Sequence, residues 1–290
     1  MPEFKTIQDL IQLAENKNTS MGQIVLEWEA ESAEKPVEEI RTRMRNYWQV
    51  MKQSIEQGLT QKIRSVTGLT GGDAKRMMDS KARIICENMK GAIARGLAVA
   101  EVNAAMKKIV AAPTAGSSGI IPATLSVTAE KLGVSEKQVI QALFTASGVG
   151  VVIANNATIS GAEGGCQAEC GVASAMAAAA VTELAGGTPK QAGHAIAIAL
   201  TNTLGLVCDP VAGLVEIPCI MRNVIGVVNA LISAEMALAG IRSVIPVDEV
   251  ILALDDVSKR LPEELKETAC GGLAITPTGL RIKEEFLGKE

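Results

Sequence analysis

The stretch SGAEGGCQAECGVASAMAAAA, residues 160–180, places two cysteines directly before a run of alanines. A run without a polar face predicts a helix that is buried on all sides. Hydrophobic residues make up 48% of the 290-residue chain, but aromatic residues only 2%. The core must therefore be built from Ala, Val, Ile, Leu and Met, whose small side chains allow helices to approach closely. The fold depends on what this alanine helix packs against.

The rest of the chain is also predicted to be helical, because period-2 alternation is scarce and helical spacing is common. We expect a helix after Pro36, one beginning near Asp73, and one from about Asp79 to Val110. Gly133 is expected to end a helix, and Ser135 to cap the next one. Together these patterns predict an all-α protein, with an N-terminal helical arm over residues 1–65 and a second domain over 66–290.

Four loops rich in small residues are expected to point inward: 67–73, 113–119, 160–166 and 205–219. Between Val139 and Ser258 the only lysine is Lys190, so we interpret this long tract as the interior.

Charge and hydropathy exclude some classes of protein. The net charge of −4 and the pI of about 5.4 argue against a nucleic-acid-binding protein, because such proteins usually have a basic face. The N-terminus is amphipathic and lacks an apolar signal segment. The apolar stretches 191–207 and 223–239 contain polar interruptions, so we interpret them as core helices and expect a cytoplasmic protein with no membrane span.

Three of the six cysteines stand at loop–helix junctions: Cys166, Cys208 and Cys219. Pro218 suits the first turn of a helix and would place Cys219 in that turn, where free N–H groups favour a thiolate. In a reducing compartment such cysteines suggest a metal or catalysis before disulfides. Thiolates are the ligands of soft metals and iron–sulfur clusters.

The alternative for any cysteine is an inert, buried side chain. We favour that interpretation for Cys86, which is expected inside a helix, and for Cys170, one helical turn after Cys166. The absence of a CxxC pair argues against a zinc ribbon.

Five segments together resemble the iron–sulfur-dependent L-serine dehydratases, and more narrowly the α subunit of the two-subunit type. They are TGLTGGDA (67–74), PTAGSSGI (113–120), NNATISGAEGGCQAECG (155–171), GLVCDPVAGLVEIPC (205–219) and KETACGGLAITPTG (266–279). The resemblance covers roughly residues 65–280. It identifies 66–290 as an iron–sulfur serine dehydratase catalytic domain.

The resemblance implies a [4Fe–4S] cluster held by Cys166, Cys208 and Cys219, with one iron left without a protein ligand. That iron would act as a Lewis acid on the hydroxyl of L-serine. The implied products are aminoacrylate and then pyruvate and ammonia. A separate β subunit with an ACT-like regulatory domain, and hence a hetero-oligomer, is also implied.

The loops around the cysteines supply candidate substrate-binding residues, because hydroxyls and backbone N–H groups at helix starts can hold an anion. These candidates are Thr70, Gly71, Gly72, Thr114, Ser117, Ser118, Gly119, Asn155, Asn156 and Ser160. The alternative for the glycines and amides is turn formation. The single histidine, His194, is a candidate catalytic base; a structural role, a base from the partner subunit and a serine alkoxide are the alternatives.

Three other functions remain open at this point. A related iron–sulfur enzyme eliminates sulfide from L-cysteine by similar chemistry. Pyridoxal-phosphate chemistry needs a lysine, which the interior tract almost lacks. A non-catalytic helical scaffold would leave the inward loops without a purpose.

Overall fold

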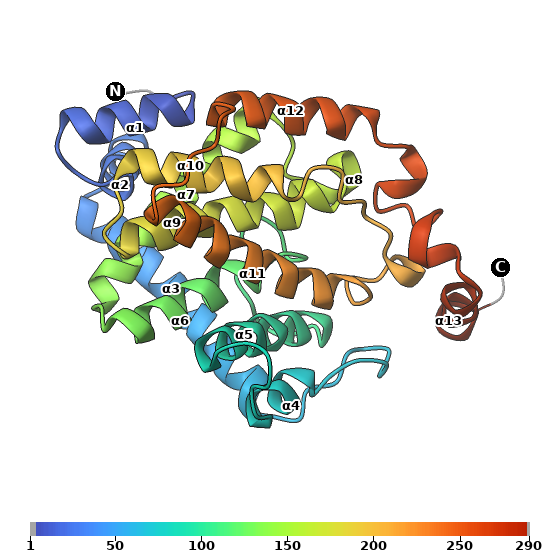
Figure 1. Ribbon diagram of the computed structural model, residues 1–290. Helices are drawn as coiled ribbons and strands as arrows, with labels where there is room; N and C mark the ends of the chain where they lie inside the picture. Colours follow the sequence, from blue (N-terminus) through green and yellow to red (C-terminus); the bar gives the residue numbers. More distant parts are fainter. Residues whose placement is uncertain (1–3, 289–290) are drawn as a thin grey trace.

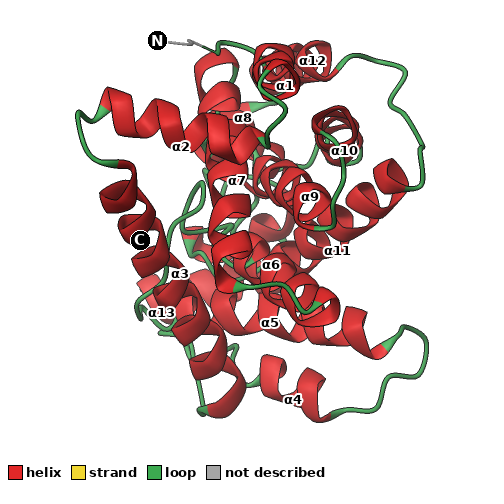
Figure 2. Ribbon diagram, turned by 90° about the vertical axis from the view of Figure 1, so that its left-hand side faces the viewer, coloured by secondary structure: helices red, strands yellow, loops and turns green. Residues whose placement is uncertain are grey.

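A computed structural model describes residues 4–288, and every regular element within that range is helical, so the predicted all-α fold is confirmed (Figure 1, Figure 2). The α-helices are α1 (Ile7–Asn16), α2 (Met21–Ser32), α3 (Val37–Thr60), α4 (Asp73–Asp79), α5 (Glu87–Ala104), α6 (Ile120–Leu132), α7 (Glu136–Asn156), α8 (Gly161–Gly164), α9 (Val172–Leu184), α10 (Pro189–Thr201), α11 (Cys219–Leu238), α12 (Val247–Arg260) and α13 (Pro277–Leu287). A π-helical turn, η1 (Gln167–Gly171), and three 3-10 turns, η2 (Val211–Gly213), η3 (Glu263–Leu265) and η4 (Gly272–Ile275), complete the set.

The alanine-rich helix α9 lies at the centre of the bundle. It packs against α6, α7, α10 and α11, and Figure 1 shows it between α10 and α11. Its alanines from Ala177 to Ala180 are fully buried. The prediction of a helix buried on all sides is therefore confirmed, and the close packing follows from the absence of large side chains on it.

The N-terminal helices share the core of the rest of the molecule. Helix α1 packs against α10, α2 against α7, and α3 against α5. The N-terminus of α2 is held by the half-buried Glu183, whose carboxylate accepts hydrogen bonds from the Met21 N–H at 2.7 Å and from the Thr145 hydroxyl. The division of the chain at residue 65 stays a prediction.

Several predicted helix ends are confirmed: Pro36 precedes α3, α4 begins at Asp73, Gly133 ends α6 in the left-handed conformation, and Ser135 caps α7.

The predicted helix from Asp79 to Val110 is wrong, because only α5 (Glu87–Ala104) is helical there. Met106 adopts a left-handed φ of 56°, which ends the helix. Cys86 precedes α5 as an exposed N-cap residue, so its predicted place inside a helix is also wrong.

Helices α7 and α11 are long and apolar enough to cross a membrane by length and composition alone. However, 61% and 50% of their most apolar windows are buried inside the protein, as in the core helices of soluble proteins.

The cysteine-bearing loops meet at one end of the bundle. The start of α11, the end of α10 and the short helix α8 all lie at the right-hand end in Figure 1. The chain after α12 returns to the same end, where Cys208 and Lys266 form an isolated parallel bridge.

The contact between α3 and α5 yields a matched pair of glycine variants. A Cβ at Gly58 would lie 2.4 Å from the Ala98 carbonyl oxygen, so Gly58→Ala should lower the free energy of unfolding by about 1–3 kcal/mol. The control is Gly91→Ala in α5, where a Cβ meets no atom within 4 Å. This substitution should raise the free energy of unfolding by about 0.5–1 kcal/mol, because alanine favours the helix over glycine. Urea unfolding of both variants measures the difference. Equal midpoints would contradict the close packing of α3 on α5.

Candidate metal centre

Four cysteines are buried together at the end of the bundle. Cys166 precedes η1, Cys208 lies in the loop after α10, and Cys219 begins α11 at the position that Pro218 predicted. The thiols of Cys170 and Cys208 both hydrogen-bond to Cys166. The sulfurs of Cys166 and Cys208 and a carboxylate oxygen of Glu169 lie within 4.8 Å of one another. These atoms form a compact donor set.

Local backbone geometry explains how two loops bring their cysteines together. Gly165 has a φ of 74°, and a Cβ there would lie 2.9 Å from the Leu206 carbonyl oxygen. Gln167, which directly follows Cys166, donates its N–H to that same carbonyl at 3.0 Å and accepts the Gly205 N–H on its side chain at 2.8 Å. The π-helical turn that follows is a feature often found at functional sites.

The thiols differ strongly in acidity. Hydrogen bonds from Cys170 and Cys208, together with the nearby Arg222, hold the pKa of Cys166 well below its usual range. The hydrogen bond to Cys166 and burial raise the pKa of Cys208. Burial and the negative Cys166 raise the pKa of Cys219 to about 12. One thiolate therefore forms readily, and the ionisation of its neighbours requires an added positive charge.

Arg222 joins three segments around the thiols. Its Nη1 donates to the Val207 carbonyl at 2.7 Å, and its Nη2 to Asp209 at 2.6 Å. The second oxygen of the buried Asp209 accepts the Leu273 N–H at 2.8 Å. Helix α11, the Cys208 loop and the C-terminal segment are thereby fixed to one another.

Asn223 fixes the loop 113–119 beside Cys219. Its Nδ2 donates to the carbonyls of Gly116 at 2.6 Å and Cys219 at 2.9 Å, while its Oδ1 accepts the Gly119 N–H at 2.9 Å. Within this loop the hydroxyls of Thr114 and Ser117 share a 3.1 Å hydrogen bond.

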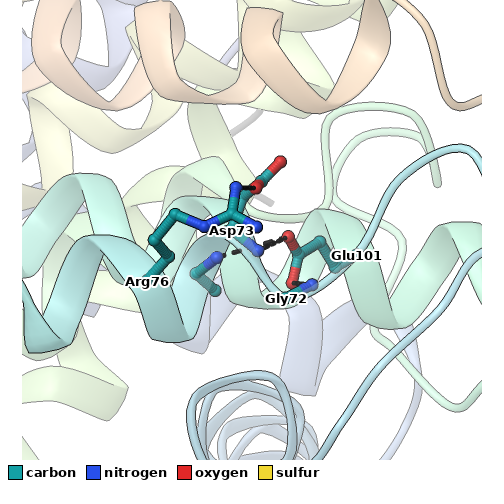
Figure 3. Close-up of polar contacts among 5 residues, drawn as sticks. Gly72, Asp73, Arg76 and Glu101 are labelled. Atoms are coloured by element: carbon teal, nitrogen blue, oxygen red, sulfur yellow. Dashed lines mark hydrogen bonds and ion pairs between the residues drawn. The ribbon is translucent and has the colours of Figure 1, made fainter.

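Two buried carboxylates hold the loop 67–73. Glu216 accepts hydrogen bonds from Thr67 at 2.8 Å and from Thr70 at 2.6 Å. Glu101 accepts the N–H groups of Gly72, Asp73 and Ala74 at the start of α4 (Figure 3). Gly71 has a φ of 128°, and a Cβ there would lie 2.4 Å from the Ile63 carbonyl oxygen. The predicted substrate donors Thr70 and Gly72 therefore already have protein partners.

Glu169 is a buried carboxylate between two of the predicted loops. Cβ atoms at Gly116 and Gly161 would lie 3.3 Å and 2.7 Å from its oxygens. Burial, followed by the negative charges of Cys166 and Glu267, raises its pKa to about 7, although a hydrogen bond from Thr114 opposes the shift. It holds a position at the thiols that the sequence analysis did not assign.

Other predicted residues lie apart from the thiols or serve local structure. Asn155 is exposed, and the Asn156 amide donates to the carbonyls of Lys5 and Val152. Ser160 is the N-cap residue of α8, one residue before Gly161.

The location of His194 relative to the thiols follows from its neighbour, Arg242. Its pKa is lowered by burial and by Arg242. Arg242 follows the C-terminal end of the 20-residue α11, whereas Cys219 begins that helix, about 30 Å away along the axis. This placement does not favour the predicted catalytic role.

The rarity of charged residues in the apolar tract is the sequence signal that could have identified the additional polar residues at the site. Charges are rare between Val139 and Ser258, and a charge in an apolar tract needs a partner or a function. Glu169, Glu216 and Arg222 all fall in that tract. Asn223 carries no charge and gave no such signal.

The site and fold define a class: an all-α protein whose inward loops gather thiols for a soft metal or cluster. The family model described as "Serine dehydratase alpha chain" matches residues 16–274. A "Probable L-serine dehydratase, alpha chain" from Bacillus subtilis is 48% identical over 98% of this chain and 96% of its own length. The L-serine dehydratase alpha chain of Peptoniphilus asaccharolyticus is 45% identical over 98% of both chains. An L-serine dehydratase from Streptomyces coelicolor is 38% identical over 94% of this chain and 61% of its own.

The chain belongs to the serine dehydratase alpha chain family.

Substitution of Asn223 tests how the loop 113–119 is held. In Asn223→Ala the Gly119 amide loses its acceptor, so the amides of 114–119 should exchange with deuterium about tenfold faster or more. Peptide-level hydrogen–deuterium exchange measures this. Asn156→Ala is the control: its amide donates to the carbonyls of Lys5 and Val152 rather than to this loop, so these amides should be unchanged. Unchanged exchange in Asn223→Ala would show that other contacts hold the loop.

Proposed function

We propose that this chain dehydrates L-serine to aminoacrylate, which tautomerises and hydrolyses to pyruvate and ammonia. The proposal is supported by the family, whose relatives carry the name L-serine dehydratase, and by the buried thiol cluster. The cofactor would be a [4Fe–4S] cluster held by Cys166, Cys208 and Cys219.

The donor set fits such a cluster. The three buried thiols come from three separate segments. Those of Cys166 and Cys208 lie within 4.8 Å of each other, and Cys219 is near enough for the charge of Cys166 to raise its pKa. Only one of the three ionises readily without a cation. When bound, the cluster would supply a Lewis-acidic iron without a protein ligand for the leaving hydroxyl. Arg222 balances part of the thiolate charge and keeps the Cys208 loop on α11.

The loop 113–119 is suited to the substrate carboxylate. The Ser118 hydroxyl is buried and has no hydrogen-bond partner within the described chain. A buried hydroxyl of this kind gains most from a ligand that accepts its hydrogen bond. In the same loop the hydroxyls of Thr114 and Ser117 hydrogen-bond to each other. The roles of Thr70, Gly71, Gly72, Gly119, Asn155, Asn156 and Ser160 in substrate binding stay predictions.

A partner subunit is part of the proposal. The relatives named alpha chains match almost end to end, whereas this chain covers 61% and 62% of the L-serine dehydratases from Streptomyces coelicolor and Escherichia coli. The name alpha chain supports a partner, which we propose to be a separate β chain with an ACT-like regulatory domain, in a cytoplasmic hetero-oligomer.

Anaerobic reconstitution with iron and sulfide tests the cluster directly. Cys166→Ala, Cys208→Ala and Cys219→Ala, each assembled with the β chain, should lose absorbance near 400 nm and pyruvate formation from L-serine. Cys170→Ala should keep both, because its thiol serves as a donor to Cys166. Wild-type protein that is active without iron would contradict the cluster. A preference for L-cysteine with release of sulfide would favour the desulfidase alternative.

Cluster loading should depend on pH. The ligands are thiolates, and the pKa of Cys219 in the unloaded protein is about 12. Loading therefore releases protons, and affinity should rise by about tenfold per pH unit for each proton released between about pH 6.5 and pH 8.5. Iron retention against a fixed chelator concentration measures it. A flat profile would mean that the thiols are already ionised.

A further inference from the structure

Two carboxylates converge beside the thiols. A Cβ on Gly161 would lie 2.7 Å from Oε2 of Glu169 and 3.1 Å from Oε2 of Glu267. A Cβ on Gly116 would lie 3.3 Å from both oxygens of Glu169. The Glu169 carboxylate therefore fills the space that glycines leave in two different loops, and Glu267 faces the same point.

The position of Glu267 is fixed to that of a predicted cluster ligand. Its N–H donates to the Cys208 carbonyl at 2.8 Å, and the Cys208 N–H donates to Leu265 at 2.8 Å. Glu267 adopts a left-handed φ of 63°, which is uncommon for a residue with a side chain. The backbone pairing with Cys208 therefore positions the Glu267 carboxylate at the edge of the site.

This carboxylate pair lacks a cation. Within residues 4–288 no recorded ion pair joins a lysine or arginine to Glu169 or Glu267. The Arg222 guanidinium, which lies near Cys166, is engaged with Asp209 and with the Val207 carbonyl. Two partly buried carboxylates in one place gain most from a ligand that carries a positive charge and hydrogen-bond donors.

We infer that Glu169 and Glu267 bind the α-ammonium group of the amino-acid substrate. The inference rests on the proposed function and extends it. Glu169 lies against Gly116 of the loop 113–119 and accepts a hydrogen bond from Thr114. The buried Ser118 hydroxyl of the same loop, which has no partner in the described chain, would donate to the substrate carboxylate. The pair makes the site selective for amino acids over hydroxy acids that carry the same hydroxyl and carboxylate.

The test compares a ligand with an ammonium group and one without it. The reconstituted enzyme with its β chain is assayed as Glu267→Gln and Glu169→Gln, with L-serine as substrate and 3-hydroxypropanoate as inhibitor. Loss of one charged partner should raise the KM for L-serine by about 10- to 100-fold. The inhibition constant of 3-hydroxypropanoate should stay the same or fall, because a negative charge near its carboxylate has been removed. Absorbance near 400 nm and iron per chain should stay at the wild-type level.

Glu264→Gln is the matched control, because Glu264 is exposed on the same segment. It should leave both constants unchanged. Equal weakening of both ligands in the Glu267 and Glu169 variants would overturn the inference, as would an unchanged KM for L-serine. Loss of iron in Glu169→Gln would show that Glu169 is a metal ligand instead. Failure of the proposed function is distinct, since the loaded wild type would then form no pyruvate from L-serine.

Discussion

The site depends on one electrostatic constraint: several thiols buried at one point cannot all ionise unless a positive charge joins them. In this chain Cys166 takes the single negative charge, supported by thiol donors and Arg222, while Cys208 and Cys219 are held protonated. The proposed metal cluster would resolve this conflict by supplying the missing positive charge. The buried alanine helix α9 gives these thiols a rigid platform.

Buried polar side chains fix three of the loops around the site. Glu216 and Glu101 hold the loop 67–73, Asn223 holds the loop 113–119, and Arg222 holds the Cys208 loop. Each of these polar groups is satisfied by backbone or side-chain partners, as burial requires. In the loop 113–119 the Ser118 hydroxyl is an exception, because it has no partner in the described chain. Glu169 accepts a hydrogen bond from Thr114, but no ion pair joins it to a lysine or arginine among the described residues.

The sequence predicts much of the fold, because local rules decide its elements. The alanine run at 177–180, the glycine at 133 and the proline at 218 each act within a few residues of themselves. The predicted helix from 79 to 110 fails because composition gave no sign of the left-handed Met106. The site is predicted less completely. Glu101 and Asn223 act on loops 28 and 104 residues away, and such pairings have no local pattern.

The most direct test of the account is the Mössbauer spectrum of protein reconstituted with ⁵⁷Fe and sulfide, recorded with and without L-serine. Three thiolate ligands leave one iron of a [4Fe–4S] cluster open to substrate. The account predicts that L-serine shifts the signal of one iron in four and leaves the other three unchanged. A spectrum that L-serine does not alter, or one that shows no cluster, would contradict it.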